Sequence, residues 1–202
     1  MSGFGHGRAA AVTGASRGIG GAVARRLTVE GFDAIVRFGS HADTAQAVAA
    51  DIREGGGDAV AVGGDVVRAE DVARLFDEAE ARFGRIDVLV NNAGVMSPMP
   101  LAGLEDGAFD RLMAVNLRGV LSGCRLACAR LRDGGRIVNL STSVLAMAPA
   151  GYGPYCASKA AVEALTRCLA KGTRGPLGHG QRRRAGTDQD GVADGGQRSR
   201  PP

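Results

Sequence analysis

The sequence predicts an α/β fold in which a doubly wound parallel sheet forms the middle of three α/β/α layers. Short apolar runs alternate with longer amphipathic segments from residue 9 to residue 171, and this alternation is typical of βαβ units. A turn with the pattern GxxxGxG, from Gly14 to Gly20, joins the first apolar run to the first helical segment. With 202 residues, 45% of them hydrophobic, the chain is long enough for one such domain.

Each element follows from the spacing of its apolar residues. The runs expected to form strands are Ala9–Val12, Asp33–Phe38, Ala59–Val62, Ile86–Val90 and Arg136–Leu140. The segments expected to form helices are Gly18–Glu30, His41–Arg53, Ala69–Phe83, Phe109–Leu131 and Tyr155–Lys171. Glycines end three of these helices, at residues 55–57, at residue 84 and at residues 134–135. With right-handed crossovers, this order gives the Rossmann architecture.

The pattern stops after Lys171, so we expect residues 1–171 to form one incomplete Rossmann domain that lacks its last strands. Residues 172–202 contain eight glycines and only four apolar residues among 31. Such a composition cannot bury a core, and we expect this segment to be disordered.

Charge and composition exclude several classes of function. The net charge is +4, but residues 172–202 hold six Arg and three Asp, which leaves only +1 for the rest of the chain. No basic face is therefore expected, and nucleic acid is excluded as a partner. No apolar run approaches the roughly 18 residues of a membrane span, so we expect a cytoplasmic protein without a membrane partner. The four cysteines are expected to be buried or half-buried thiols, with no metal site.

The turn from Thr13 to Gly20 is a candidate phosphate site. Its glycines let the backbone turn tightly and approach a pyrophosphate, and the following helix presents free N–H groups to it. The residues of this turn expected to bind a dinucleotide are Gly14, Ser16, Arg17, Gly18, Ile19 and Gly20.

Two more motifs follow in order: Asn91-Asn92-Ala93-Gly94 after the fourth strand, and Tyr155-x-x-x-Lys159 on the last helix. Together with the turn, they resemble the short-chain dehydrogenase/reductase family over residues 8–171. The resemblance implies a hydride transfer between a nicotinamide cofactor and a small carbonyl or alcohol substrate. It also implies that full-length relatives form homodimers or homotetramers, which leaves the assembly of this chain open.

The resemblance also implies roles for individual residues. Asp65 and Val66 would meet the adenine of the cofactor, and Asn92, Ala93 and Gly94 would line its binding site. The residues implied to be catalytic are Asn116, Tyr155 and Lys159, of which the last two would also contact the cofactor.

A tyrosine and a lysine on one helix face make chemical sense as a proton-transfer pair. A free tyrosine titrates near pH 10 and is a poor acid–base group at neutral pH. Lys159 lies one helical turn from Tyr155, and its charge favours the tyrosinate form. Asn116 would hold a water that links Lys159 to solvent.

The hydroxyl group that would orient the substrate oxygen has two candidates. The spacing usual in the family, thirteen residues before the tyrosine, gives Thr142. The residue type favours Ser143, which fits if the following loop is one residue shorter. Both residues remain candidates.

The end of the second strand indicates the choice of cofactor. NAD enzymes of this architecture place an acid there, but this chain has Arg37 and Ser40, with Arg17 in the glycine turn. Two cations and a hydroxyl suit a 2′-phosphate, so NADP(H) is favoured over NAD(H). The alternative for Arg37 is an ordinary exposed side chain.

Two segments, residues 140–143 and 151–155, look most like bacterial 3-oxoacyl-[acyl-carrier-protein] reductases, although the substrate stays open.

One extra nucleotide after the Lys171 codon would explain the composition of residues 172–202. With that nucleotide removed, the codons allow a strand-like continuation, VNAVAPGP. We therefore expect residues 172–202 to be derived from a frameshift, with low stability and weak turnover as consequences. The alternatives are a catalytically impaired product and a nucleotide-binding protein without turnover.

Overall fold

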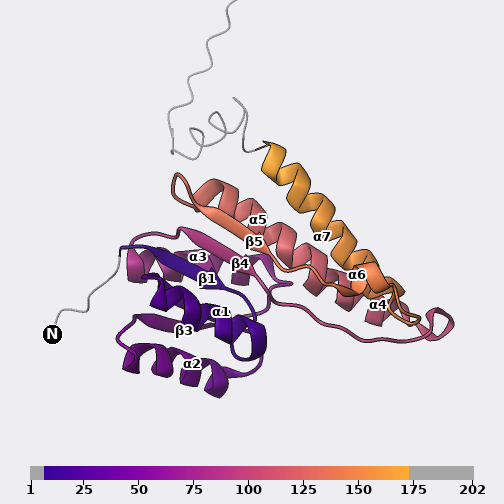
Figure 1. The fold of residues 1–202 in the computed structure, drawn as a ribbon, viewed down its shortest axis with the longest axis horizontal. Coiled ribbons are helices and arrows are strands. Elements are labelled where there is room, and N and C mark those ends of the chain that lie inside the picture. The colour runs from indigo at the N-terminus through magenta and orange to yellow at the C-terminus, as the bar shows by residue number, and fades with distance from the viewer. Residues whose placement is uncertain (1–6, 173–202) are drawn as a thin grey trace, which may run out of the picture.

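A computed structural model describes residues 7–172 of the chain (Figure 1). Its sheet has five parallel strands in the order β3-β2-β1-β4-β5, which confirms the predicted doubly wound topology. The strands are β1 (Ala9–Val12), β2 (Asp33–Phe38), β3 (Ala59–Gly63), β4 (Val88–Asn91) and β5 (Arg136–Asn139). The order reverses at β1, so a crevice for a ligand is expected where the carboxyl ends of β1 and β4 separate.

The helices follow the predicted segments closely. The longer ones are α1 (Gly18–Val29), α2 (Ala42–Glu54), α3 (Ala69–Phe83), α4 (Asp106–Met113), α5 (Gly119–Arg130) and α7 (Gly153–Gly172). The helix predicted as Phe109–Leu131 begins earlier and contains a π-helical turn, η2 (Ala114–Arg118), between α4 and α5. Two short elements, η1 (Leu101–Gly103) and α6 (Val144–Met147), were not predicted because one helical turn leaves no hydrophobic period to detect.

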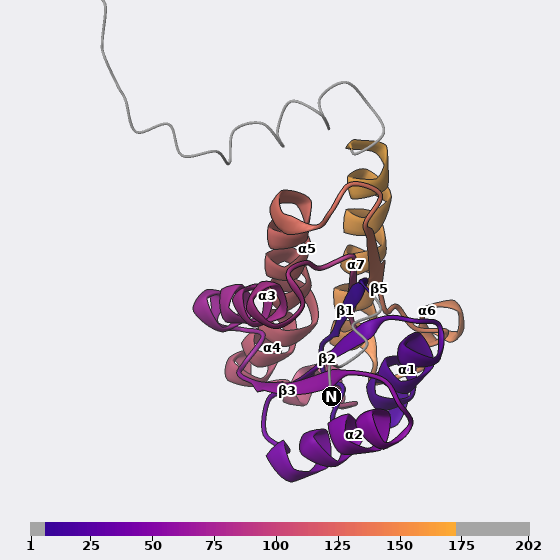
Figure 2. The ribbon, with the colours of Figure 1, turned by 90° about the vertical axis from the view of Figure 1, so that its left-hand side faces the viewer.

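Helices cover both faces of the sheet (Figure 2). On one face, α1 and α2 pack against β1 and β2 through small and branched side chains such as Ala24, Val48 and Val36. On the other face, α3 packs through Leu75 and Phe76. These side chains are at most 3% exposed. All four residues of β1 are fully buried, which fixes the central strand that leads into the glycine turn.

A third apolar cluster holds α7 in place. Val120 and Cys124 of α5 contact Val162 of α7, so α7 runs along α5 beside β5 (Figure 1). In residues 7–172, β5 pairs only with β4, and Val138 at this edge is 46% exposed. An open edge at β5 agrees with the expectation that the sheet lacks its last strands.

The continuous helix Asp106–Arg130 is the one described segment long and apolar enough to cross a membrane, with a mean hydropathy of 1.2. It packs against α3 and α7 and belongs to the core of the domain.

Cys124 is buried and Cys156 partly buried as expected, whereas Cys128 and Cys168 are exposed, so the prediction was wrong for these two. The tail predicted to be disordered lies outside the described residues apart from Gly172, the last residue of α7.

Candidate functional site

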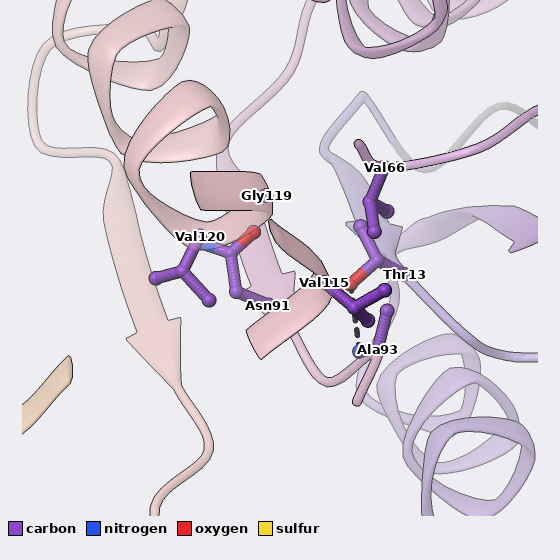
Figure 3. A pocket seen from close by; sticks show the side chains of 7 residues that line it. All are labelled: Thr13, Val66, Asn91, Ala93, Val115, Gly119 and Val120. Carbon is purple, nitrogen blue, oxygen red and sulfur yellow. Dashed lines mark hydrogen bonds between the residues drawn. The ribbon is translucent and has the colours of Figure 1, made fainter. Parts of the chain in front are cut away.

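Two loops meet where the strand order reverses, and their side chains tie them together. The Thr13 hydroxyl accepts hydrogen bonds from the backbone N–H groups of Asn92 and Ala93, both at 3.0 Å. The Asn92 side-chain amide donates to the carbonyl oxygens of Thr13 and Gly14 at 2.9 and 3.1 Å. Figure 3 shows Thr13 beside Ala93. The glycine turn and the segment after β4 therefore form one rigid unit.

Three glycines of the turn are required for different reasons. A Cβ on Gly20 would stand 2.5 Å from both the Asn92 amide and the Gly14 carbonyl oxygen, and one on Gly14 would stand 2.9 Å from the Ala93 Cα. Gly18 has a φ of +56°, a backbone conformation that favours glycine. No atom lies within 4 Å of a Cβ built at Gly18, so the space beside it is open.

The N-terminus of α1 suits an anion. Arg17 precedes it with extended backbone, its side chain makes no capping hydrogen bond, and the first turn contains no acidic residue. The first N–H groups of the helix are therefore available, and the helix dipole places partial positive charge there. Open space at Gly18 and these free donors fit a pyrophosphate group.

An open groove of about 410 Å³ runs over this end of the sheet, within the usual size of small-molecule sites. Predicted cofactor residues that line it are Gly14, Ser16, Arg17, Ile19, Gly20, Arg37, Ser40, Asp65, Val66, Asn92, Ala93 and Gly94. Gly18, Tyr155 and Lys159 do not line it. Lining residues that sequence reasoning missed are Phe38, Gly39, His41, Gly64, Val95, Arg111 and Val115. Most of these neighbour a predicted site residue in the chain, but no local signal marks Arg111 on α4.

The floor of the groove is closely packed. Beneath it, a cavity of about 10 Å³ lies between Thr13, Val66 and Val115 on one side and Asn91 and α5 on the other (Figure 3). This volume has room for about one water molecule. This cavity is therefore too small for a cofactor or a substrate.

Lys159 lies close to one end of the groove. It is 5% exposed, and its ammonium donates to the Leu140 carbonyl oxygen at 2.8 Å. A Cβ on Gly94, a groove residue, would be 3.7 Å from the Lys159 Nζ atom. Burial lowers the pKa of Lys159 from its ordinary value. A charged, partly desolvated donor is thus held where the groove approaches α7.

Asn116 joins the segment after β4 to α7. It is fully buried in the π-helical turn, its Oδ1 accepts from the Val95 N–H at 2.8 Å, and its Nδ2 donates to the Val95 carbonyl and the Ser158 hydroxyl. π-Helical turns inside α-helices often mark functional positions. Both Nδ2 hydrogens are used, so the role predicted for Asn116 as a water ligand stays a prediction that these contacts do not test.

Tyr155 lies one turn before Lys159 on α7 and is half-buried. Its ring meets that of Tyr152 edge to face, with centroids 6.4 Å apart. Of the two candidate hydroxyls, Thr142 accepts the Val144 N–H at 3.2 Å at the start of α6, and Ser143 is exposed. These contacts favour neither residue, so both remain candidates.

Arg37 is not the ordinary exposed side chain of the alternative prediction. Its side chain is only 1% exposed, and its guanidinium donates to the carbonyl oxygens of Gly63 and Asp71. It points under the end of β3 toward α3 and also lines the groove, so its contact with a 2′-phosphate stays a prediction. Arg17 and Ser40, by contrast, are exposed at the groove.

The depressed pKa of Lys159 predicts how stability depends on pH. The unfolded chain keeps this proton up to about pH 10.4, whereas the folded chain loses it at lower pH. Between those values the unfolded state binds more protons, so this group adds stability as the pH rises. We expect the free energy of unfolding of the wild type, relative to Lys159→Met, to increase through this alkaline window. Denaturant melts at several pH values would measure it, and a flat or falling difference would contradict the burial of a charged lysine.

Comparisons with known proteins identify the family of the chain. A family model described as short chain dehydrogenase matches residues 8–175. A short-chain type dehydrogenase/reductase of Picea abies is 43% identical over 84% of this chain, and the 3-oxoacyl-[acyl-carrier-protein] reductase FabG of Staphylococcus epidermidis is 34% identical over 81%. The crystal structure of a short chain dehydrogenase from Burkholderia cenocepacia, in complex with NADP, superimposes with a TM-score of 0.81, at 38% identity over 85% of this chain. The matches cover 66%, 68% and 70% of these three proteins, so the chain spans about two thirds of each.

Proposed function

Because this chain belongs to the short-chain dehydrogenase family, we propose that it is an NADP(H)-dependent oxidoreductase acting on a small carbonyl or alcohol substrate. One observation carries the proposal: the buried ammonium of Lys159 lies beside Gly94, between the helix that bears Tyr155 and the nucleotide groove. This arrangement supports a role of Tyr155 and Lys159 as a proton-transfer pair at the edge of a groove that would hold a dinucleotide.

The chain's own residues suit the parts of such a cofactor. The open backbone at Gly18 and the free N–H groups of α1 would hold the pyrophosphate. Asp65 and Val66 would meet the adenine, and Lys159 would hold the ribose next to the nicotinamide. When bound, the nicotinamide supplies or accepts the hydride.

The protein would supply the proton. In the direction of reduction, the Tyr155 hydroxyl donates its proton to the substrate oxygen as that oxygen gains charge. The positive charge of Lys159 stabilises the resulting tyrosinate. Thr142 or Ser143 would donate a hydrogen bond that orients the same oxygen. Asn116 would hold α7 against the segment after β4, since its side-chain amide bonds to both.

The preference for NADP(H) is part of the proposal, and it now depends on Arg17 and Ser40. Both are exposed at the groove, and the strand end at Phe38-Gly39 has no acid to bind a ribose 2′-hydroxyl. The Burkholderia neighbour, whose structure contains NADP, supports a nicotinamide cofactor.

Replacing Arg17 by Ala should therefore reduce cofactor discrimination. We expect the dissociation constant of NADPH to rise roughly tenfold, which corresponds to about 1.4 kcal/mol, while that of NADH changes little. Arg26→Ala is a matched control, because Arg26 is an exposed arginine of α1 that pairs with Glu30 and does not line the groove. Titration calorimetry would measure both, and an equal loss for NADPH and NADH would contradict a 2′-phosphate contact.

The substrate class is proposed more broadly than the sequence resemblance suggested. The match to the Staphylococcus epidermidis reductase is compatible with a 3-oxoacyl substrate, but a plant relative is more similar to this chain. We therefore propose a small carbonyl compound as the substrate. A cytoplasmic location is also part of the proposal, and the assembly of this chain stays open.

The function is tested by following NADPH consumption over a panel of carbonyl compounds, including a 3-oxoacyl thioester and cyclic ketones. Saturable NADPH binding with carbonyl-dependent oxidation supports the proposal. A chain that binds neither NADPH nor NADH would refute it.

A further inference from the structure

Arg37 is a buried charge that the proposed mechanism does not use. It lies at the end of β2, is 1% exposed, and donates to the carbonyl oxygens of Gly63 and Asp71, the latter at 3.0 Å. Within the described residues its Nε atom has no hydrogen-bond partner. Burial lowers the pKa of this guanidinium from its ordinary value. A buried arginine is costly to a fold unless its charge is paired and its N–H groups are hydrogen-bonded.

What it organises is the loop after β3. The Asp71 carboxylate accepts a hydrogen bond from the Asp65 N–H at 2.8 Å and forms an ion pair with Arg74 at 2.7 Å. The Asp65 amide holds the pKa of Asp71 below its ordinary value, so this carboxylate remains charged at neutral pH. Arg74 also donates to the Gly63 carbonyl oxygen at 3.2 Å. The backbone of residues 63–65 is therefore held by three side chains, those of Arg37, Asp71 and Arg74.

Gly64 shows how closely the loop rests on this support. Its φ is +146°, and a Cβ at this position would clash with the guanidinium of Arg37. The guanidinium therefore fills the space that a side chain at residue 64 would need. Gly64, Asp65 and Val66 all line the groove, and Arg37 lines it beside them.

We infer that Arg37 is a positioning residue for the adenosine half of the dinucleotide: it sets the backbone of residues 64–66 and does not contact the 2′-phosphate. The inference rests on the proposed function, in which Asp65 and Val66 meet the adenine. NADPH and NADH share this half, so Arg37 contributes equally to the binding of both. Arg17, by contrast, is proposed to distinguish NADPH from NADH.

The test compares Arg37→Met, which keeps the stem but not the hydrogen bonds, with Arg37→Lys, which keeps the charge. Binding of NADPH, NADH and nicotinamide mononucleotide, which lacks the adenosine half, is measured for each variant. We expect Arg37→Met to weaken NADPH and NADH by the same factor, roughly tenfold or more, because a displaced loop misplaces its contacts. Arg37→Lys should weaken both by a smaller, equal factor. Nicotinamide mononucleotide should bind each variant as it binds the wild type.

The outcomes separate the possible roles. A loss confined to NADPH, as expected for Arg17→Ala, would overturn the inference and make Arg37 a phosphate ligand. Equal weakening of all three ligands, or unchanged affinity for both dinucleotides, would also overturn it and leave Arg37 with a purely structural role. If Arg37→Met does not fold, the same three outcomes are read from Arg37→Lys. A wild-type chain that binds neither dinucleotide would refute the proposed function itself, and this is established before any variant is compared.

Discussion

Replacing Tyr155 by Phe is expected to lower the rate of NADPH-dependent carbonyl reduction by about 10²–10⁴-fold, the range found when a positioned acid–base group is lost. The substitution removes one hydroxyl and keeps the ring that meets Tyr152 edge to face. Tyr155 does not line the groove, so the dissociation constant of NADPH should stay within about threefold of the wild-type value, less than 1 kcal/mol. Steady-state kinetics and a binding titration on the same preparations would measure both effects.

Tyr152→Phe is the matched control for this change. It removes a hydroxyl from the neighbouring ring without touching the residue assigned to proton transfer. If Tyr152→Phe were as inactive as Tyr155→Phe, or if Tyr155→Phe kept more than about a tenth of the rate, a shortfall of under 1.4 kcal/mol, the assignment of Tyr155 as acid would be wrong.

Replacing Gly20 by Ala should damage both the fold and the groove. The new methyl group would lie 2.5 Å from the Gly14 carbonyl oxygen, which is backbone and cannot move without opening the glycine turn. Forcing an extra methyl into a packed site costs about 1–3 kcal/mol, which lowers the melting temperature by roughly 2–4 °C per kcal/mol in a domain of this size. Because the Asn92 amide must also shift, NADPH binding should weaken further at temperatures where the variant is still folded.

Gly107→Ala tests whether the effect depends on position. Gly107 lies in helix α4, is exposed, and has nothing within 4 Å of a Cβ. Alanine there should raise stability by up to about 1 kcal/mol, because glycine is the poorer helix former. Thermal melts of both variants decide the matter, and a Gly20→Ala protein as stable as the wild type would contradict the contact between the two loops.

Much of the fold could be predicted from sequence because strands and helices alternate with clear hydrophobic periods. β1, β2 and α3 have the predicted bounds, and the other long elements shift by a few residues. The π-helical turn at residues 114–118 was not predictable, because its apolar spacing looks like that of a continuous helix. Within this turn the buried Asn116 amide bonds to the segment after β4 and to Ser158, which are tertiary contacts that local spacing does not reveal.

The candidate site, too, could be predicted only in part. Motif residues that line the groove could be predicted because positions such as Gly14 and Gly20 have no room for a Cβ, and the glycines there form a recognisable pattern. The contacts of Arg37 could not be predicted, because a charge at a strand end does not show which groups the side chain will bond to. Its actual direction depends on Gly63 and Asp71, residues on other elements that local patterns do not reveal.

A crystal structure of the chain with NADP⁺ would test the central claim most directly. The account predicts pyrophosphate at the N-terminus of α1, adenine against Asp65 and Val66, and the nicotinamide ring beside Lys159 with its reactive carbon facing the Tyr155 hydroxyl. A nicotinamide bound away from Tyr155, or a nucleotide bound outside the groove, would contradict it.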